Sequence, residues 1–552
     1  MNTQLKTVLE AFCEKESARP DDVFLVQPMA GAEVATYTFA EVGEQSRRMA
    51  AYLRSLGLPE GSNIALISNN CAHWFIADLA IWMAGFVSVP IYPVLTAESV
   101  RPILEHCDAK LVFVGKLADW PAMASGIPEH LPRIGLPIRP EGEFLEWESL
   151  IAANEPLAES RKPDPDELAT IIYTSGTTGD PKGVMHSFST LGFAAKSGVE
   201  LYNIGADDRL LSYLPLAHVA ERAVVEFCAI YSGARVFFVH SLDTFAADLA
   251  RARPTLFFGV PRIWSKLQSG VHKKVAPATL DWILRVPWLG RRFGAKIVSG
   301  LGLDQARLAI SGAAPISEGL LEWYRRLGLS ILEGYGMTEN AAYSHGMRPD
   351  SIRIGTVGQP QPGVEVRLGA GDEVLVRSNA TMLGYYRNPE ATRECLDEDG
   401  FLHTGDAGAI DSDGFLRITG RVKDSFKTAK GKFVVPAPIE SRLLDHPDIE
   451  QACVLGRGLH APLGLCVLGA HVADQGKDTL TRQFEQLLQQ LNAGLEKHER
   501  LSGLVLVGEE WSVENGCLTP TLKVKRPALE MRYGKFLEQW AEQKTAVIWA
   551  DA

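Results

Sequence analysis

A short run of small, hydroxyl-bearing residues follows an apolar segment in the first third of the chain. Residues 173–184 read YTSGTTGDPKGV and continue the strand-like segment 170–174. Glycines let backbone N–H groups approach an anion closely, hydroxyls donate further hydrogen bonds, and a lysine adds positive charge. The run therefore predicts a polyphosphate cradle made of Thr174, Ser175, Gly176, Thr177, Thr178, Gly179 and Lys182.

The spacing of this run differs from that of the common nucleotide-binding loop, G-x-x-x-x-G-K-S/T. The fifth residue after Gly176 is Pro181, and the fifth after Gly179 is Val184. A phosphotransferase of the Walker type is therefore disfavoured. A flexible surface turn is the plain alternative for any Ser/Gly run, but the preceding apolar strand and Lys182 favour phosphate binding.

The loop closely resembles the signature loop of the adenylate-forming superfamily, which includes acyl-CoA synthetases, luciferases and peptide-synthetase adenylation domains. Further motifs follow in that family's order up to about residue 526, in a style similar to long-chain fatty acid–CoA ligases. The resemblance implies three small-molecule partners, namely ATP, a carboxylic acid and coenzyme A, together with Mg²⁺.

Two further motifs resemble the family's adenine and phosphate contacts. The run at 312–315, GAAP, follows the strand-like segment 307–311, and residues 333–340 read EGYGMTEN. By resemblance, Tyr335 stacks on adenine, Thr338 contacts the α-phosphate and Glu339 binds Mg²⁺, whose preferred ligands are carboxylate and phosphate oxygens. A buried tyrosine beside a helix cap is the alternative. The nucleotide residues implied here are Gly312, Ala313, Ala314, Glu333, Gly334, Tyr335 and Gly336.

Three more side chains acquire roles only through the resemblance. Asp406, in HTGDAG, is implied to accept both ribose hydroxyls, and Arg421 to add a ribose or phosphate contact. His218, in YLPLAHVAER, is implied to line the carboxylate end of the acid site and to act in catalysis. Without the resemblance to the family, we would interpret these residues as an Asp-Gly turn, a surface arginine and an ordinary core histidine.

Two lysines near the C-terminus compete for the family's catalytic lysine. The segment LTPTLKVKR holds Lys523 and Lys525, and alignment on Arg526 selects Lys523. Leu522 stands where the family usually has glycine, so the segment departs from the common pattern. His186 lies two positions before the histidine that the family often has after its signature loop, and we assign it no role.

Composition limits the class of protein. The chain has 552 residues and a net charge of −12, so binding to nucleic acid through bulk charge is excluded. Its eight cysteines form no C-x-x-C pair, which indicates reduced thiols rather than a disulfide framework or a metal site. The polar N-terminus lacks a signal-type apolar core, and the apolar stretch 74–94 is interrupted by Asp78 and Pro90. We expect a cytoplasmic protein without a transmembrane segment. Peripheral membrane contact remains possible, although no amphipathic anchor stands out, and the oligomeric state is not readable.

The sequence patterns around these residues predict helices and strands of an α/β fold. Short apolar runs alternate with helical patterns up to about residue 355, which favours mostly parallel sheets with functional loops at the strand ends. Period-two patterns in 364–376 and 416–420 predict a small antiparallel region. A polar, lysine-rich stretch near Lys423 predicts a hinge. We therefore expect a large N-terminal domain, 1–422, that binds acid and ATP, and a small mobile α+β domain, 423–552, that carries the catalytic lysine.

Together these features imply an AMP-forming acyl-CoA ligase for a medium- or long-chain fatty acid. The alternatives left open are an adenylating enzyme for an aromatic or terpenoid acid, one that loads a separate acyl carrier protein, and a non-catalytic ATP- or acyl-binding protein. The chain contains both Glu339 and Lys523, which disfavours the last of these.

Overall fold

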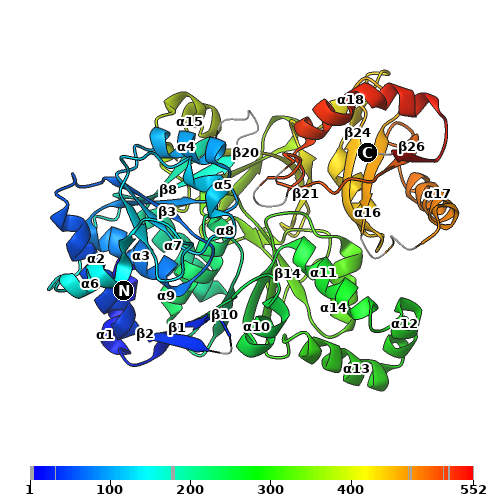
Figure 1. Cartoon of the computed structure of the whole chain (residues 1–552). Coiled ribbons are helices and arrows are strands. Elements are labelled where there is room, and N and C mark those ends of the chain that lie inside the picture. The colour runs from blue at the N-terminus through cyan, green and yellow to red at the C-terminus, as the bar shows by residue number, and fades with distance from the viewer. Residues whose placement is uncertain are drawn as a thin grey trace.

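The computed structural model describes residues 5–31, 33–175, 181–469, 472, 475–513, 515–519 and 523–550, with the backbone alone of Ser175. Two large mixed sheets form the N-terminal part of the chain (Figure 1). The eight-stranded sheet has the order β19-β9-β8-β4-β3-β5-β6-β7. Its strands are β3 Asn63–Ile67, β4 Val87–Ile91, β5 Leu111–Val114, β6 Arg133–Gly135, β7 Leu145–Glu146, β8 Leu168–Ser175, β9 Pro181–Ser187 and β19 Gly384–Tyr385.

The second large sheet has nine strands in the order β16-β15-β14-β13-β12-β10-β11-β1-β2. Its six inner strands, from β14 to β1, are parallel, and the remaining edge strands are antiparallel. The strands are β1 Val23–Pro28, β2 Val34–Thr38, β10 Arg209–Ser212, β11 Arg235–Phe238, β12 Leu256–Gly259, β13 Leu308–Ser311, β14 Ile331–Tyr335, β15 His345–Gly346 and β16 Gln359–Pro360.

A largely apolar helix, α3 (Ala72–Ala84), packs in the core shared by the two large sheets. All its residues are buried, including His73 and Asp78, because a helix with apolar side chains on every face is stable only with neighbours on every side. It ends at Gly85, whose φ of 87° is the left-handed conformation that glycine adopts without strain. The indole of Trp82 donates to the Ala169 carbonyl at the start of β8 (2.8 Å), so α3 also fixes the strand that leads to the signature loop.

The other helices of the N-terminal part surround these sheets (Figure 1). They are α1 Val8–Ala18, α2 Phe39–Ser55, α4 Ala97–His106, α5 Trp120–Ala124, α6 Trp147–Ala153, α7 Phe188–Leu201, α8 Val219–Glu221, α9 Cys228–Ser232, α10 Phe245–Ala252, α11 Pro261–His272, α12 Pro277–Arg285, α13 Pro287–Gly300, α14 Glu318–Arg326 and α15 Pro389–Cys395. A π-helix, Arg222–Phe227, joins α8 to α9, and 3₁₀ turns occur at Thr338–Asn340 and Ala370–Asp372.

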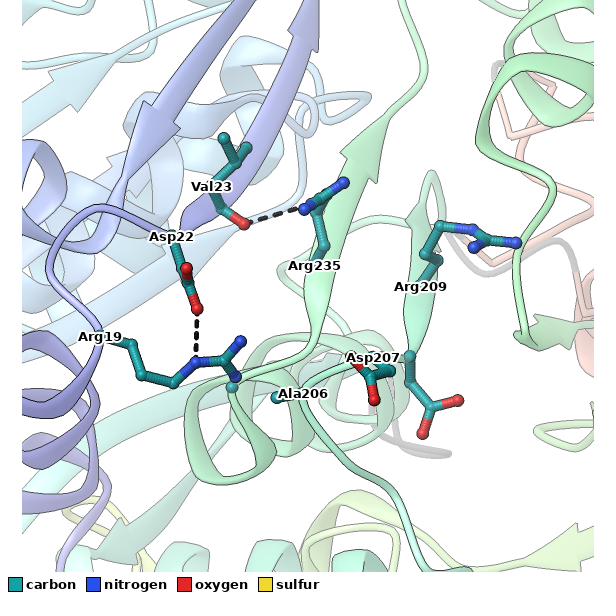
Figure 2. Close-up of a pocket in the computed structure, with 9 residues that line it drawn as sticks. Arg19, Asp22, Val23, Ala206, Asp207, Arg209 and Arg235 are labelled. Carbon is teal, nitrogen blue, oxygen red and sulfur yellow. Dashed lines mark hydrogen bonds and ion pairs between the residues drawn. The ribbon is translucent and has the colours of Figure 1, made fainter.

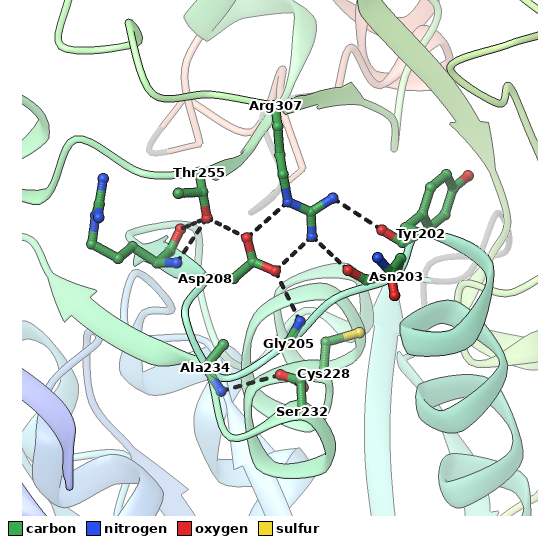
Figure 3. Close-up of polar contacts among 10 residues, drawn as sticks. Tyr202, Asn203, Gly205, Asp208, Cys228, Ser232, Ala234, Thr255 and Arg307 are labelled. Carbon is green, nitrogen blue, oxygen red and sulfur yellow. Dashed lines mark hydrogen bonds and ion pairs between the residues drawn. The ribbon is translucent and has the colours of Figure 1, made fainter.

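The amino ends of the parallel strands are held by polar contacts that contain no predicted site residue. Arg209 and Arg235, which begin β10 and β11, line a small cavity of about 160 Å³ together with Arg19 and Asp22 (Figure 2). Beside it, Asp208 accepts hydrogen bonds from Thr255 (2.6 Å) and Arg307 (2.9 Å), which precede β12 and β13 (Figure 3). These contacts align three neighbouring strands in register at their starts.

The C-terminal part begins with small antiparallel elements. A four-stranded sheet, β17-β18-β20-β21, consists of Glu365–Leu368, Glu373–Arg377, Leu402–Ile410 and Leu416–Arg421. After the hairpin β22 Phe426–Lys427 and β23 Phe433–Val434, a second four-stranded sheet contains β24 Ile449–Leu455, β25 Leu463–Leu468, β26 Gly503–Val507 and β27 Val547–Ala550. Helices α16 Pro436–Leu444, α17 Lys477–Ala493 and α18 Arg526–Glu542 cover it. The buried apolar clusters of this sheet contain no residue before Phe426, so its core is built locally.

The predicted α/β fold class is confirmed, including the small antiparallel region. Among the described residues, no helix is long and apolar enough to cross a membrane.

Candidate active site

The predicted site residues gather at the carboxyl ends of the parallel strands, opposite the cavity of Figure 2. Gly259 and Ser311 end β12 and β13 and lie in register with each other, and Glu333, within β14, lies in register with Ser311. The segments that follow β13 and β14 are GAAP and the end of EGYGMTEN. Because parallel strands bring their carboxyl ends to one edge, residues far apart in the sequence meet there.

The described part of the signature loop is the β8–β9 hairpin on which it is mounted. Thr174 pairs with Lys182 across this hairpin, and the backbone of Ser175 pairs with Pro181. The ammonium of Lys182 lies 5.0 Å from the centre of the Tyr385 ring, which holds the side chain over β19. Gly176, Thr177, Thr178 and Gly179, also predicted to bind phosphate, lie outside the described residues.

Close backbone packing explains the small residues of the predicted adenine site. A Cβ on Gly312 would lie 3.0 Å from the Gly334 carbonyl oxygen, and one on Gly336 would lie 2.5 Å from the carbonyl carbon of Ala342. Ala313 has a φ of 66°, and Ala314 follows it on the same loop. The buried hydroxyl of Ser311 has no hydrogen-bond partner among the described residues. An unpaired buried hydroxyl is costly, so this edge of the sheet suits a polar ligand.

The side chains predicted to contact ribose form one connected group. Asp406 lies opposite Arg421 in the β20–β21 pair, and their side chains form an ion pair (2.9 Å). The second carboxylate oxygen of Asp406 accepts a hydrogen bond from the hydroxyl of Tyr335 (2.7 Å). Burial raises the pKa of that hydroxyl well above its usual value, so it remains a donor. The ring of Tyr335 is thus fixed from its far end.

The backbone of Thr338 is held by a residue that the sequence interpretation left without a role. His186, buried on β9, lies 2.6 Å from the Thr338 carbonyl oxygen through Nε2 and 3.2 Å from the Thr190 hydroxyl through Nδ1. Burial lowers its pKa to about 4, so the ring is neutral at physiological pH and Nε2 is the donor. His186, to which the sequence assigns no role, therefore holds the backbone of the predicted phosphate contact. Only its shifted place after the signature loop could have indicated this.

Glu339, the predicted metal ligand, is buried and oriented. Its Oε1 accepts a hydrogen bond from Tyr385 (2.7 Å), and its backbone carbonyl accepts one from the Met382 N–H (2.8 Å). No cluster of three or more His, Cys, Asp or Glu side chains with metal-binding geometry occurs among the described residues. A single protein carboxylate nevertheless fits Mg²⁺, which usually keeps several waters and takes substrate phosphate oxygens as its other ligands.

His218 is half-buried in the loop between β10 and α8. Burial, and then the charge of Lys523, lowers its pKa to about 3, so the imidazole is neutral at physiological pH. Its Nδ1 accepts a hydrogen bond from the Ala220 N–H (3.0 Å), which leaves Nε2 as the protonated nitrogen. The ring can therefore offer one N–H donor without adding a positive charge.

The loop before His218 is fixed by Asn70, which sequence reasoning did not identify. The Asn70 amide donates to the Ser212 hydroxyl (2.7 Å), the Leu214 carbonyl (2.7 Å) and Glu221 (3.2 Å), and its oxygen accepts from the Leu216 N–H (3.3 Å). These contacts join the end of β3 to the end of β10. No motif indicates this asparagine, because its role exists only once the two large sheets are packed.

Lys523 reaches the site from the C-terminal part of the chain. It lies close enough to Arg421, Asp406 and Glu339 for all three charges to act on it, and its own charge acts on His218. Its pKa is lowered, first by desolvation and then by Arg421. Arg526 anchors the segment, because it pairs with Glu440 (2.6 Å) and so fixes the start of α18. Lys523 therefore shares one electrostatic environment with His218, Glu339, Asp406 and Arg421.

Comparisons with known proteins identify the family of the chain. The profile of the family described as AMP-binding enzyme matches residues 12–386, and that of the AMP-binding enzyme C-terminal domain matches residues 423–544. The chain belongs to the AMP-binding enzyme family. It is an AMP-forming acid–thiol ligase family enzyme of the adenylate-forming superfamily.

Among the relatives of this AMP-binding enzyme are two ligases with named substrates. A long-chain-fatty-acid–CoA ligase of Mycobacterium bovis, FadD15, is 33% identical, with 95% of each chain covered. The peroxisomal long chain acyl-CoA synthetase 7 of Arabidopsis thaliana is 30% identical over 92% of this chain and 82% of its own. The structure of anthranilate CoA ligase AuaEII with anthranoyl-AMP has a TM-score of 0.81 at 22% identity and covers 98% of this chain and 99% of its own, which shows a shared fold.

Proposed function

We propose that this enzyme activates a medium- or long-chain fatty acid with ATP and transfers the acyl group to coenzyme A. The observation that carries the proposal is the meeting of Lys523 with His218, Glu339, Asp406 and Arg421, residues supplied by four separate segments. Two relatives at about 30% identity over most of the chain carry names of long-chain ligases, which supports the choice of acid.

The first step joins the acid to the nucleotide. A carboxylate oxygen of the acid forms a bond to the α-phosphorus of ATP, and the bond from that phosphorus to the bridging oxygen breaks, so pyrophosphate leaves with the electron pair. Negative charge increases on the α-phosphate oxygens during this exchange. Lys523 would neutralise it, and the Nε2–H of His218 would donate to the acid carboxylate without protonating it.

Glu339 would hold Mg²⁺ through its carboxylate. The metal, when bound, supplies positive charge to the phosphate oxygens. The contact from Tyr385 orients Glu339 for this purpose, and Thr338 stands beside it with its backbone fixed by His186. The group of Tyr335, Asp406 and Arg421 would hold the adenine and ribose, and Thr174, Ser175 and Lys182, with the loop they flank, would hold the phosphates.

The second step exchanges AMP for the thiol. The sulfur of coenzyme A forms a bond to the acyl carbon, AMP leaves with the bonding electrons, and the thiol proton passes to solvent. Lys523 belongs to the C-terminal segment and lies at the site where the thiol must enter. We therefore propose that residues 423–552 form a domain that rotates near Lys423 to admit the thiol. The exposed, lysine-rich segment around Lys423 and the separate apolar core after Phe426 support a hinge there.

The hinge has its own test. Lys423→Pro restricts rotation at the proposed pivot, so we expect adenylation at near the wild-type rate but at least about tenfold slower thioester formation. Single-turnover measurements of acyl-AMP and acyl-CoA separate the two steps. Equal loss of both would place the pivot elsewhere.

A cytoplasmic location is also part of the proposal. All eight cysteines are free thiols, which supports a reducing compartment.

The proposed function is tested by pyrophosphate release with ATP and Mg²⁺ across a panel of acids, with and without coenzyme A. The panel runs from acetate through long-chain fatty acids to aromatic and polycyclic acids. We expect turnover that depends on coenzyme A and is fastest with medium- or long-chain acids. Exchange of pyrophosphate into ATP without an effect of coenzyme A would favour a carrier protein as acceptor. Turnover restricted to aromatic acids would overturn the choice of acid but keep the chemistry.

A further inference from the structure

The helical hairpin formed by α12 and α13 carries two exposed tryptophans. Trp282 is 64% exposed on α12, and Trp288 is 71% exposed in the first turn of α13. The other nine tryptophans of the chain are buried or half-buried. Val286, between the two helices, is exposed as well (41%). Neighbouring exposed aromatic side chains of this size are uncommon on a protein surface and mark interaction sites.

The inner face of this hairpin is firmly packed against the core. The exposure of the two tryptophans therefore does not result from a loosely held pair of helices. Leu284 and Ile297 pack against the buried cluster around α14, and Leu280 and Val298 belong to that cluster. A Cβ on Gly294 would lie 2.7 Å from the Leu327 carbonyl oxygen, so α13 touches the backbone after α14 directly. The hairpin therefore presents its outer face as a fixed surface at the periphery of the molecule (Figure 1).

The segment that contains this hairpin is strongly basic. Residues 265–300 contain seven lysines and arginines and a single acidic residue, Asp281, although the whole chain has a net charge of −12. Asp281 already pairs with Arg326 (2.8 Å). The seven cations are Lys266, Lys273, Lys274, Arg285, Arg291, Arg292 and Lys296, all exposed, and none forms an ion pair with another described residue.

The helical spacing joins the two features. On α13, Trp288, Arg291, Arg292 and Lys296 follow one another at intervals of three or four residues or side by side, and all are exposed. Residues three and four apart lie on one face of a helix. The outer face of α13 thus alternates an aromatic ring with cations, and Trp282 and Arg285 continue it on α12.

We propose that this hairpin docks the enzyme onto an anionic membrane surface. Indole rings favour the region between lipid headgroups and acyl chains, and lysine and arginine are attracted to anionic headgroups. An acidic protein would otherwise be repelled from such a surface, so a local cluster of unpaired cations is required. Two exposed indoles beside unpaired cations fit an anionic lipid bilayer better than an acidic protein, because the bilayer interface accommodates both groups whereas acidic side chains would match the cations alone.

The docking surface is connected to the catalytic edge by a single helix. Helix α11 starts one residue beyond the end of β12, and it ends at His272, immediately before Lys273 and Lys274. Near its start, the buried indole of Trp264 donates to the Gly259 carbonyl (2.9 Å), which ties the helix to the strand end. The docked face would therefore lie at the far end of α11 from the candidate active site.

Vesicle flotation with the full-length protein tests this proposal. Vesicles of phosphatidylcholine are compared with vesicles that also contain phosphatidylglycerol, at low and high salt. We expect binding only to the anionic vesicles, weakened by salt because exposed charges are screened. A blue shift of tryptophan emission and quenching by brominated lipid are expected too, since only Trp282 and Trp288 are exposed.

Two variants, each with a matched control, locate the surface. W282A/W288A is expected to reduce vesicle binding at least about tenfold through lost apolar contact. R291E/R292E is expected to reduce it at least about twentyfold, because a basic residue near an anionic surface contributes about fivefold. The controls are M531A, which removes another exposed apolar side chain, and K162E/K497E, which changes the net charge equally. Both controls should bind as the wild type does.

Three results would overturn the proposal. One is equal binding to neutral and anionic vesicles, and another is unchanged binding of both hairpin variants. The third is a concentration-dependent dimer, seen by sedimentation velocity, that W282A/W288A abolishes without any effect on vesicles. Vesicle binding is measured without ATP or acid, so its failure is independent of the proposed reaction.

Discussion

Two arginine-centred charge clusters in this enzyme have opposite surroundings. Arg222 follows His218 by one helical turn, with Asp78 and Glu226 as ion-pair partners, and all three of these charged side chains are fully buried. Its guanidinium also donates to Thr170 (2.8 Å) and lies about 5 Å from the rings of Trp74 and Phe227. Arg421 pairs with Asp406 at the candidate active site, but its side chain is 45% exposed.

The difference concerns which partners each cluster can accept. Two carboxylates surround the single charge of Arg222, and burial raises the pKa of both Asp78 and Glu226, so the cluster is neutral when one of them is protonated. The Arg222 cluster then needs no bound counter-ion or ligand to balance its charge. The cluster at Arg421 reaches water on one side and gathers Lys523 and Glu339 from other segments, so it can accept a polyanion. A sealed charge cluster fixes the fold, whereas an accessible one is available for chemistry.

Loss of the central cation should disrupt the sealed cluster most severely. Arg222→Met leaves two carboxyl groups in an apolar core, and removal of one partner from a buried ion pair commonly costs about 3–5 kcal/mol. We expect a loss of that size in the free energy of unfolding, measured by urea titration. Arg353→Met, which removes an arginine from a solvent-exposed ion pair, is the matched control and should change little. Equal effects in the two variants would remove the distinction between sealed and accessible clusters.

Loss of the cation from the accessible cluster should affect rate rather than stability. Lys523→Ala removes a charge from the site where phosphate charge increases, so we expect adenylation to fall about 10²–10³-fold with ATP affinity largely kept. Acid-dependent pyrophosphate release and a nucleotide titration measure the two quantities. Lys525→Ala is the control and should adenylate at close to the wild-type rate. If Lys525→Ala were the slower variant, the assignment of the lysine would be wrong.

Asn70 contacts Glu221, next to Arg222, and the loop before His218, and its loss should have an intermediate effect. Asn70→Ala removes the side chain that holds the loop before His218, and a small misplacement of a catalytic group can cost about 10–100-fold in rate. We expect a lower kcat with unchanged ATP affinity. Asn69→Ala, which loses only a contact to the Lys116 carbonyl, should keep its rate. A change in ATP affinity alone would show that Asn70 does not act through the His218 loop.

The sequence predicts the parts of this molecule that repeat local patterns. The apolar runs at β3, β8 and β13 are strands, and the motif residues lie at strand ends, as expected for parallel sheets. Helix α18 and strand β27, after the predicted catalytic lysine, were not predicted, although the buried residues of α18 (Leu529, Tyr533, Leu537 and Trp540) follow one another at helical spacing. Contacts between the two large sheets, such as Asn70 with Leu214 and His186 with Thr338, could not be predicted, since no local pattern encodes them.

An effect that depends on pH, and does not concern rate, is expected for Glu221, which adjoins Arg222 and accepts a hydrogen bond from Asn70. Burial raises its pKa to about 8, although it accepts hydrogen bonds from Ser212 and the Tyr213 N–H. Between the ordinary value of 4.5 and about 8, the folded protein therefore holds a proton that the unfolded chain has lost. Stability conferred by this group falls as pH rises through that window, by on the order of 1 kcal/mol per pH unit at most, and changes no further above it. Glu221→Gln cannot titrate, so wild-type stability should decline relative to the variant from pH 5 to 8, as measured by urea titration at each pH. A stability difference that does not change with pH would mean that Glu221 is ionised in the folded protein. Glu221 would then resemble the accessible charged residues at Arg421 and not the sealed cluster at Arg222.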